Sequence, residues 1–154
     1  MAYEKILFIC YANIARSQMA EAFYNYYTKT NNAISAGIAD FGEKYHHVPH
    51  KGVIEVMLEK NITMSQHKVK TVTPKMSKKV HKIIVFCEID KCPEFIKDNP
   101  KTIHMPLKDP GANINGPNDY SKEIIQGLRN SREEIETVVK EIVYSQVNKS
   151  SFSH

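Results

Sequence analysis

The sequence predicts an α/β protein in which helices cover both faces of a parallel β-sheet. Two observations carry this prediction. Short apolar runs, of which residues 5–9 and 82–86 are the strongest, alternate along the chain with longer segments whose apolar residues recur at helical spacing. These runs also lack the polar–apolar alternation of a half-solvated strand, and continuous apolar strands are typical of parallel sheets buried between helices.

Local signals justify the individual elements. Gly37 ends the second strand, and Thr73-Pro74 supplies a capping residue followed by a first-turn proline. Glycines and prolines between residues 109 and 119 indicate a loop before the last helix. The predicted strands are 5–9, 33–36, 82–86 and 102–105, and the predicted helices are 17–28, 50–60, two short helices opening at 73–74 and 92–93, and 121–145.

Length and composition favour one globular domain. The chain has 154 residues, 42% hydrophobic and 25% charged, and we place the domain at residues 1–146 and a frayed polar tail at 147–154. No apolar run reaches the length of a membrane span, and no signal peptide precedes the first strand. The net charge of +4 accompanies no nucleic-acid motif, and three cysteines do not suggest a secreted disulfide framework. We therefore expect a cytoplasmic protein without membrane or nucleic-acid partners.

The loop between the first strand and the first helix carries the strongest functional signal. Its residues are Cys10, Tyr11, Ala12, Asn13, Ile14, Ala15, Arg16 and Ser17. A loop of this length can wrap its N–H groups around one tetrahedral oxyanion, and the following helix adds unpaired N–H groups and a positive dipole end. That field favours a thiolate at Cys10, and Arg16 can hold two anion oxygens at once. The predicted chemistry is thiolate attack on the central atom of a bound oxyanion.

A second cysteine ends the other strong strand. Segments 5–10 and 82–87 share one pattern, a lysine followed by four apolar residues and a cysteine. If these strands are neighbours, both cysteines lie at the carboxyl edge of the sheet, where open parallel sheets bind ligands. A strand spacing of about 4.8 Å is within disulfide reach. Cys87 is then either a partner of Cys10 or a small apolar residue that ends a strand, and Cys92 offers it a second partner.

Together these motifs resemble the low-molecular-weight protein-tyrosine phosphatase superfamily, and within it the thioredoxin-coupled arsenate reductases. The resemblance covers about residues 4–145. It rests on Cys10-x5-Arg16-Ser17, Ser17-Gln-Met-Ala-Glu21, Ser35-Ala-Gly37, Ser65-Gln-His67, Cys87 with Cys92-Pro93, and Asp109-Pro110. It implies a three-layer fold whose four-stranded parallel sheet has the order 2-1-3-4.

The resemblance also implies a role for each motif residue. Cys10 is the nucleophile, Arg16 clamps the anion that the loop N–H groups bind, and Ser17 donates a hydrogen bond to the Cys10 sulfur. Asn13 braces the loop. Asp109 is the general acid that protonates the leaving oxygen, although an aspartate before proline is more commonly a turn residue.

Two activities share the first half of this reaction. In the phosphatases a phosphocysteine forms, and water hydrolyses it with Asp109 as the base. In the reductases Cys10 binds arsenic, and Cys87 and then Cys92 take over a disulfide that thioredoxin or a similar thiol reductant reduces. We predict arsenate reduction through these three cysteines, with hydrolysis of phosphotyrosine or small phosphate esters as the alternative and no tightly bound cofactor. A non-catalytic oxyanion or redox sensor is a third hypothesis, which the general acid disfavours.

Several positions depart from the family pattern. Four residues separate Cys87 from Cys92, where these reductases usually have six, so the closed ring is tighter. Ala12 stands at a usual glycine. Gly111-Ala112 stands where many tyrosine phosphatases carry aromatic residues that hold the substrate ring, which favours the reductase.

The resemblance implies at most a weakened metal site. Some reductases bind potassium near the loop through residues that match Asn13, Glu21 and Ser35, and the fourth, acidic ligand falls at Thr63. We expect no other metal site, because the histidines at 46–50 lack metal-site spacing and belong to an exposed loop.

Overall fold

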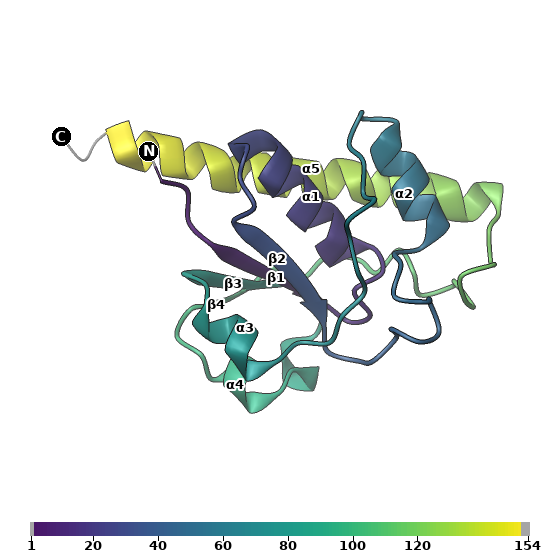
Figure 1. Cartoon of the computed structure of the whole chain (residues 1–154), viewed down its shortest axis with the longest axis horizontal. Helices are drawn as coiled ribbons and strands as arrows, with labels where there is room; N and C mark the ends of the chain where they lie inside the picture. Colours follow the sequence, from purple (N-terminus) through teal and green to yellow (C-terminus); the bar gives the residue numbers. More distant parts are fainter. Residues whose placement is uncertain (1, 152–154) are drawn as a thin grey trace.

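The structure, a computed structural model, describes residues 2–151 and consists of a four-stranded parallel sheet between two layers of helices (Figure 1). The strands are β1 (Ile6–Cys10), β2 (Ala33–Gly37), β3 (Lys82–Val85) and β4 (Thr102–His104). Their order across the sheet is β2-β1-β3-β4, which confirms the predicted class and the order implied by the family resemblance. The central strand β1 is buried along its whole length, which explains its continuous apolar sequence.

Helices α1 (Arg16–Thr28), α2 (Lys51–Leu58) and α5 (Lys122–Ser151) lie on one side of the sheet, and α3 (Pro74–Lys78) and α4 (Glu94–Lys97) lie on the other (Figure 1). A short 3-10 helix, η1 (Ile89–Lys91), precedes α4. Alternate β1 side chains serve two cores. Phe8 packs into the cluster that contains α1 and α5 residues, whereas Leu7 and Ile9 pack into the cluster on the α4 side. None of the helices within residues 2–151 has the length and apolar character that a membrane crossing requires.

The C-terminal helix is longer than predicted. The frayed tail expected from residue 147 is helical as far as Ser151, and residues 152–154 lie outside the described part. Gln146 explains part of the extension, because its side chain accepts a hydrogen bond from the Glu4 N–H at 2.9 Å and donates one to the Tyr24 hydroxyl at 3.0 Å. A polar residue therefore secures the end of α5 against the start of the chain.

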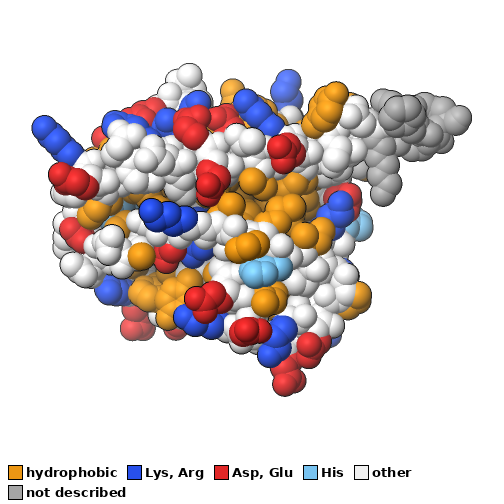
Figure 2. Space-filling model, turned by 180° about the vertical axis from the view of Figure 1, so that it is seen from behind, with side chains coloured by type: hydrophobic (Ala, Val, Ile, Leu, Met, Phe, Trp, Pro, Cys, Tyr) orange, Lys and Arg blue, Asp and Glu red, His pale blue; other side chains and the backbone are white. Residues whose placement is uncertain are grey.

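The back of the molecule carries charges of both signs. Figure 2 shows Lys and Arg side chains interspersed with Asp and Glu side chains over this face, with hydrophobic side chains between them. The net charge of +4 is therefore not gathered into one continuous basic surface on this side.

Candidate active site

The oxyanion motif forms the turn from β1 into α1. Cys10 ends the strand and Arg16 begins the helix, and these side chains are buried. Asn13 adopts a left-handed backbone with φ of 60°, which turns its N–H toward the Cys10 sulfur at 3.3 Å. The residue before α1 is Ala15, whose side chain makes no capping hydrogen bond with the described residues. The first N–H groups of α1 are therefore left for an anion.

Two groups approach the Cys10 sulfur. Ser17 Oγ lies 2.9 Å from it, and the Asn13 N–H donates to it. Asn13 Nδ2 donates to Ser17 Oγ at 2.8 Å, so the hydroxyl accepts there and its own proton is left to donate to the sulfur. Both groups therefore present a hydrogen-bond donor to the sulfur.

The Arg16 guanidinium joins the loop to the ends of β3 and β4. Its Nη1 donates to the carbonyls of Phe86 at 3.2 Å and Leu107 at 3.1 Å. Its Nη2 lies 3.7 Å from Asp109 Oδ2. Within residues 2–151 no hydrogen bond engages Nε, so one edge of the guanidinium is left to hold an oxyanion.

Asp109 lies at the mouth of the site. Its side chain is 43% exposed, and its Oδ1 accepts the Gly111 N–H at 2.8 Å in a local turn. Asp109 is therefore a turn residue, and the same turn also presents its second carboxylate oxygen, Oδ2, toward Arg16. One cavity of about 250 Å³ includes Cys10, Arg16 and Asp109 in its lining.

The cavity walls contain residues that the sequence alone did not single out as site residues. Phe41, Lys44, Tyr45 and Ile114 line it together with Ile14. The signal that points to them is topological, because loops that follow parallel strands meet at the carboxyl edge of the sheet, and residues 38–49 follow β2.

Aromatic rings form much of this rim. Tyr11 and Phe41 meet edge to face with centroids 5.8 Å apart, and Tyr45 lies 6.3 Å beyond Phe41. Lys44 Nζ lies 5.7 Å from the Phe41 ring, and Lys91 Nζ lies 5.9 Å from the Tyr11 ring. The aromatic side chains of this rim thus come from the loops after β1 and β2, whereas Gly111 and Ala112 line the cavity without an aromatic ring.

A second cavity of about 510 Å³ adjoins the first and shares Tyr11, Arg16 and Asp109 with it. Cys87 lines this second cavity. Burial, with smaller contributions from the neighbouring Cys92 and Cys10 thiols, raises the pKa of the Cys87 thiol to about 12, and Arg16 opposes this shift. Burial also raises the pKa of Cys92, although the neighbouring Cys87 thiol opposes this effect. All three cysteines are free thiols.

The strand register bears on the possible pairing of Cys10 with Cys87. β1 and β3 are neighbours, but Ile6 pairs with Lys82 and Ile9 with Val85, one residue out of step with the repeated sequence pattern. Because side chains alternate across a sheet, the two cysteines belong to different cores: Cys10 to the cluster on the α1 side and Cys87 to the cluster on the α4 side. Cys87 is therefore not directly opposite Cys10.

The residues implied for a potassium site are already engaged with protein groups. Asn13 Oδ1 accepts hydrogen bonds from Gln18 Nε2 at 2.9 Å and the Lys70 N–H at 3.0 Å, and its Nδ2 donates to Ser35 Oγ at 3.0 Å. Ser35 Oγ donates to Glu21 Oε1 at 2.7 Å. A potassium ion needs oxygen ligands with free lone pairs. Asn13 instead directs its Nδ2 donor at Ser35, and its Oδ1 already accepts two hydrogen bonds, so this arrangement does not fit the ion. Nor does the described part of the chain contain a cluster of three or more His, Cys, Asp or Glu side chains placed for a metal.

The expectation that the histidines at 46–50 all lie in an exposed loop is wrong for His50. Its side chain is buried, and its Nδ1 accepts the Gly52 N–H at 3.0 Å as the cap of α2. With that tautomer, Nε2 donates to the Asp119 carbonyl at 3.0 Å. Burial lowers the pKa of His50, more than its Asp119 hydrogen bond raises it. His46 and His47 are exposed, as expected.

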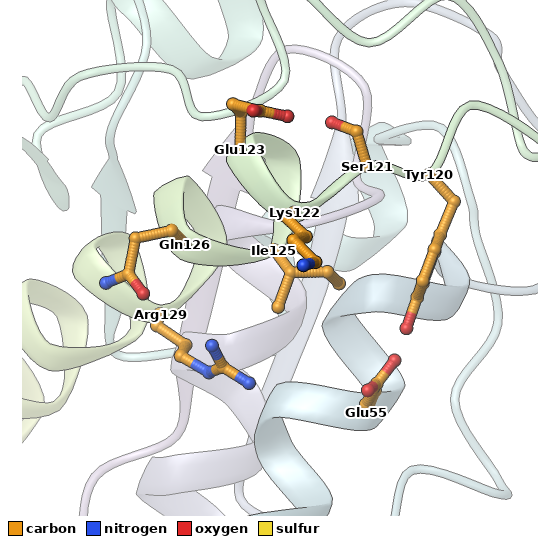
Figure 3. A pocket seen from close by; sticks show the side chains of 8 residues that line it. All are labelled: Glu55, Tyr120, Ser121, Lys122, Glu123, Ile125, Gln126 and Arg129. Atoms are coloured by element: carbon orange, nitrogen blue, oxygen red, sulfur yellow. The ribbon is translucent and has the colours of Figure 1, made fainter.

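A larger cavity of about 770 Å³ lies apart from the oxyanion loop, between α2 and the start of α5 (Figure 3). Its lining mixes acidic Glu55 and Glu123 with basic Lys122 and Arg129, and it contains none of the cysteines. The chemistry of the motif therefore belongs to the smaller cavity around Cys10.

The sequence as a whole points to the same family as this site. The profile of the low molecular weight phosphotyrosine protein phosphatase family matches residues 5–152. The chain belongs to this family. No curated protein matches the sequence.

Solved structures with the same phosphatase-family fold include enzymes of different activities. The YwlE arginine phosphatase from Geobacillus stearothermophilus is 22% identical, with a TM-score of 0.72 and 97% of each chain covered. Vibrio vulnificus Wzb in complex with benzylphosphonate is 19% identical, with a TM-score of 0.68, 91% of this chain and 99% of that chain covered. The thioredoxin-dependent arsenate reductase of Corynebacterium glutamicum is 23% identical, with a TM-score of 0.66, 96% of this chain and 63% of that chain covered. At these identities the likeness establishes the fold.

Proposed function

We propose that this chain is a phosphatase that hydrolyses phosphotyrosine or small aryl phosphate esters through a phosphocysteine at Cys10. The observation that carries the proposal is one cavity in which the Cys10 sulfur, with Ser17 Oγ 2.9 Å away, lies together with Arg16 and Asp109. These groups supply a nucleophile, an oxyanion clamp and a proton donor, which are the three parts that phosphoryl transfer to a thiolate requires.

The proposed reaction has two steps. The Cys10 thiolate attacks phosphorus, the bond from phosphorus to the ester oxygen breaks, and Asp109 gives its proton to that departing oxygen. The Asp109 carboxylate then takes a proton from a water molecule, whose oxygen attacks phosphorus, and the sulfur–phosphorus bond breaks. Inorganic phosphate leaves and the thiolate is restored. Loop N–H groups and the free edge of Arg16 stabilise the charge on the equatorial oxygens in both steps.

The walls of the cavity favour an aryl ester. Ile14, Phe41 and Tyr45 present apolar surface beside Cys10, and a phenyl ring can stack against such a rim. The guanidinium of a phosphoarginine residue would instead lose part of its hydration against these walls. We therefore expect phosphotyrosine to be preferred over phosphoarginine.

The direct test compares hydrolysis of p-nitrophenyl phosphate, a phosphotyrosine peptide and a phosphoarginine peptide by the same preparation. We expect turnover of the first two and its complete loss in Cys10→Ser. Binding of phosphate without any turnover would instead support a non-catalytic oxyanion sensor.

A second candidate function, arsenate reduction, is favoured by the position of Cys87 and Cys92, two free thiols buried in the same apolar cluster. In this reaction the Cys10 thiolate attacks the arsenic of arsenate and one arsenic–oxygen bond breaks, its oxygen leaving as water. Cys87 then attacks the Cys10 sulfur, and the sulfur–arsenic bond breaks with its electron pair going to arsenic. Arsenite leaves with the two electrons that the two thiols give up as they form a disulfide. Cys92 then attacks Cys87, which frees Cys10, and an external dithiol such as thioredoxin reduces the Cys87–Cys92 disulfide.

Two features make the relay harder than hydrolysis. The register of β1 and β3 does not place Cys87 opposite Cys10. In addition, a Cys87 pKa of about 12 leaves almost none of this thiol in the reactive thiolate form at neutral pH. Arsenate-dependent NADPH oxidation in the presence of thioredoxin and thioredoxin reductase tests this candidate. Turnover that disappears in Cys92→Ser, while aryl phosphate hydrolysis persists in the same variant, would establish the relay as a second activity.

A further inference from the structure

The ammonium group of Lys70 lies beside the carboxylate of Glu21, the residue that the reductase resemblance implies as a cation ligand near the oxyanion loop. Lys70 Nζ is 3.9 Å from Glu21 Oε1, and the Glu21 side chain is only 14% exposed. The main chain of Lys70 is held on both sides, because its N–H donates to Asn13 Oδ1 and its carbonyl accepts the Gly37 N–H at 2.8 Å. The loop and strand that form the site therefore also fix the position of this lysine.

We propose that the Lys70 ammonium is the built-in counter-ion of Glu21 and takes the place of a bound monovalent cation behind the oxyanion loop. A carboxylate with so little exposure requires an opposite charge or several donors. His67 Nδ1 also lies 3.4 Å from Glu21 Oε2, but burial lowers the pKa of His67, so its imidazole is neutral at neutral pH. Lys70 thus supplies the positive charge on this side of the loop.

The charge matters because Glu21 starts a chain of hydrogen bonds that ends at Cys10. An ionised Glu21 only accepts, so Ser35 Oγ donates to it and itself accepts from Asn13 Nδ2. The other Asn13 Nδ2 proton goes to Ser17 Oγ, whose own proton then faces the Cys10 sulfur. The ammonium is therefore a positioning group that acts through this chain, and the inference rests on Cys10 as the proposed nucleophile, whatever its substrate.

The test measures the reactivity of the Cys10 thiol in choline chloride, NaCl and KCl at equal ionic strength. Iodoacetamide alkylation is followed by mass spectrometry of the Cys10 peptide, which reports the nucleophile without any substrate. We expect the native protein to react at the same rate in all three salts. Lys70→Met should react about fivefold more slowly in choline chloride and recover in NaCl and KCl alike, because either small cation can then screen the Glu21 carboxylate without a potassium-selective site. Lys70→Arg keeps the charge and should behave as the native protein.

The matched control is Lys75→Met, which removes an exposed lysine of α3 and should change nothing. Saturable acceleration of the native protein by potassium would overturn the proposal, since a cation would then be needed despite Lys70. A folded Lys70→Met that matches the native rate in choline chloride would also overturn it. If that variant does not fold, Glu21→Gln combined with Lys70→Met removes both charges. It should fold and ignore potassium, and its rate should stay below the native one because a neutral amide no longer fixes the direction of the Ser35–Asn13 chain; continued misfolding would count against the proposed pairing. Because alkylation of Cys10 needs no substrate, these outcomes can be interpreted even if the protein shows no phosphatase activity.

Discussion

Ser17 Oγ lies 2.9 Å from the Cys10 sulfur and receives a hydrogen bond from Asn13 Nδ2 at 2.8 Å. The Asn13 Nδ2 group can only donate, so the Ser17 hydroxyl accepts there and its own proton is left to donate to the sulfur. Asn13 therefore fixes the direction of the hydrogen bond that the Cys10 sulfur receives. This relationship ties the turn at Asn13, with its left-handed backbone, to the environment of the proposed nucleophile Cys10.

Ser17→Ala removes the hydroxyl that faces the sulfur. A hydrogen bond to a charged group contributes about 1.5–3 kcal/mol, so we expect kcat for p-nitrophenyl phosphate to fall by about 10- to 100-fold while KM changes little. Ser17→Thr keeps the donor and should retain more activity than Ser17→Ala. Equal activity in the native protein and Ser17→Ala would show that the hydroxyl does not act on the thiolate.

Asp109→Asn removes the proposed proton donor without changing the shape of the turn. We expect hydrolysis to fall by about 100-fold or more for esters with poor leaving groups, because general acid catalysis contributes about 10²–10⁴. Esters whose leaving group departs without a proton should lose less. A series of aryl phosphates with leaving groups of different acidity measures this difference, and an equal loss across the series would assign Asp109 to structure.

Two glycines should respond in opposite ways to alanine. A Cβ at Gly37 would lie 2.9 Å from the main chain of Ala12 and Tyr11, so Gly37→Ala must displace the oxyanion loop. We expect it to lower kcat/KM by more than about tenfold, as a displaced loop no longer positions the anion.

A Cβ at Gly127, inside α5, meets nothing within 4 Å. Gly127→Ala should leave kinetics unchanged and stabilise the protein by about 0.5–1 kcal/mol. Denaturant unfolding and steady-state kinetics on both variants check the pair.

The sequence predicted those parts of the fold and site that depend on short segments. The apolar runs marked the strands, and the Cys10–Arg16 spacing marked a loop that the structure brings together with Asp109. The rim residues Phe41 and Tyr45 escaped prediction because they reach the cavity only through the position of β2 at the sheet edge. Similar local patterns likewise do not determine register, which depends on packing across both faces of the sheet.

The pairing of β1 with β3 illustrates that limit. Matching the two lysine-led segments aligns Cys10 with Cys87, yet the sheet pairs Ile9 with Val85 and sends the cysteines to opposite cores. A shift of one residue exchanges the faces of every side chain in a strand. His50 shows the same limit, because a polar residue in a histidine-rich segment became a buried helix cap once α2 had docked against α5.

His50 gives the protein an acid-sensitive contact. Its Nδ1 accepts the Gly52 N–H, and protonation of that nitrogen removes the cap of α2. Burial lowers the pKa of His50 from 6.5, so the unfolded chain takes up a proton at higher pH than the folded protein. The unfolded state then binds more protons between the two pKa values, and stability rises with pH there. The contribution of His50 is complete above about pH 6.5 and is lost as pH falls through its folded pKa.

We therefore expect the urea midpoint of the native protein to fall between pH 7.5 and pH 5, and to fall less in His50→Asn. Asparagine can still cap α2 but does not titrate in this range. His67, whose pKa burial also lowers, should account for part of the remaining slope. His46→Asn is the matched control, because His46 is exposed and its left-handed backbone suits asparagine. If His50→Asn and His46→Asn keep the native slope, the buried cap is not the group that takes up the proton.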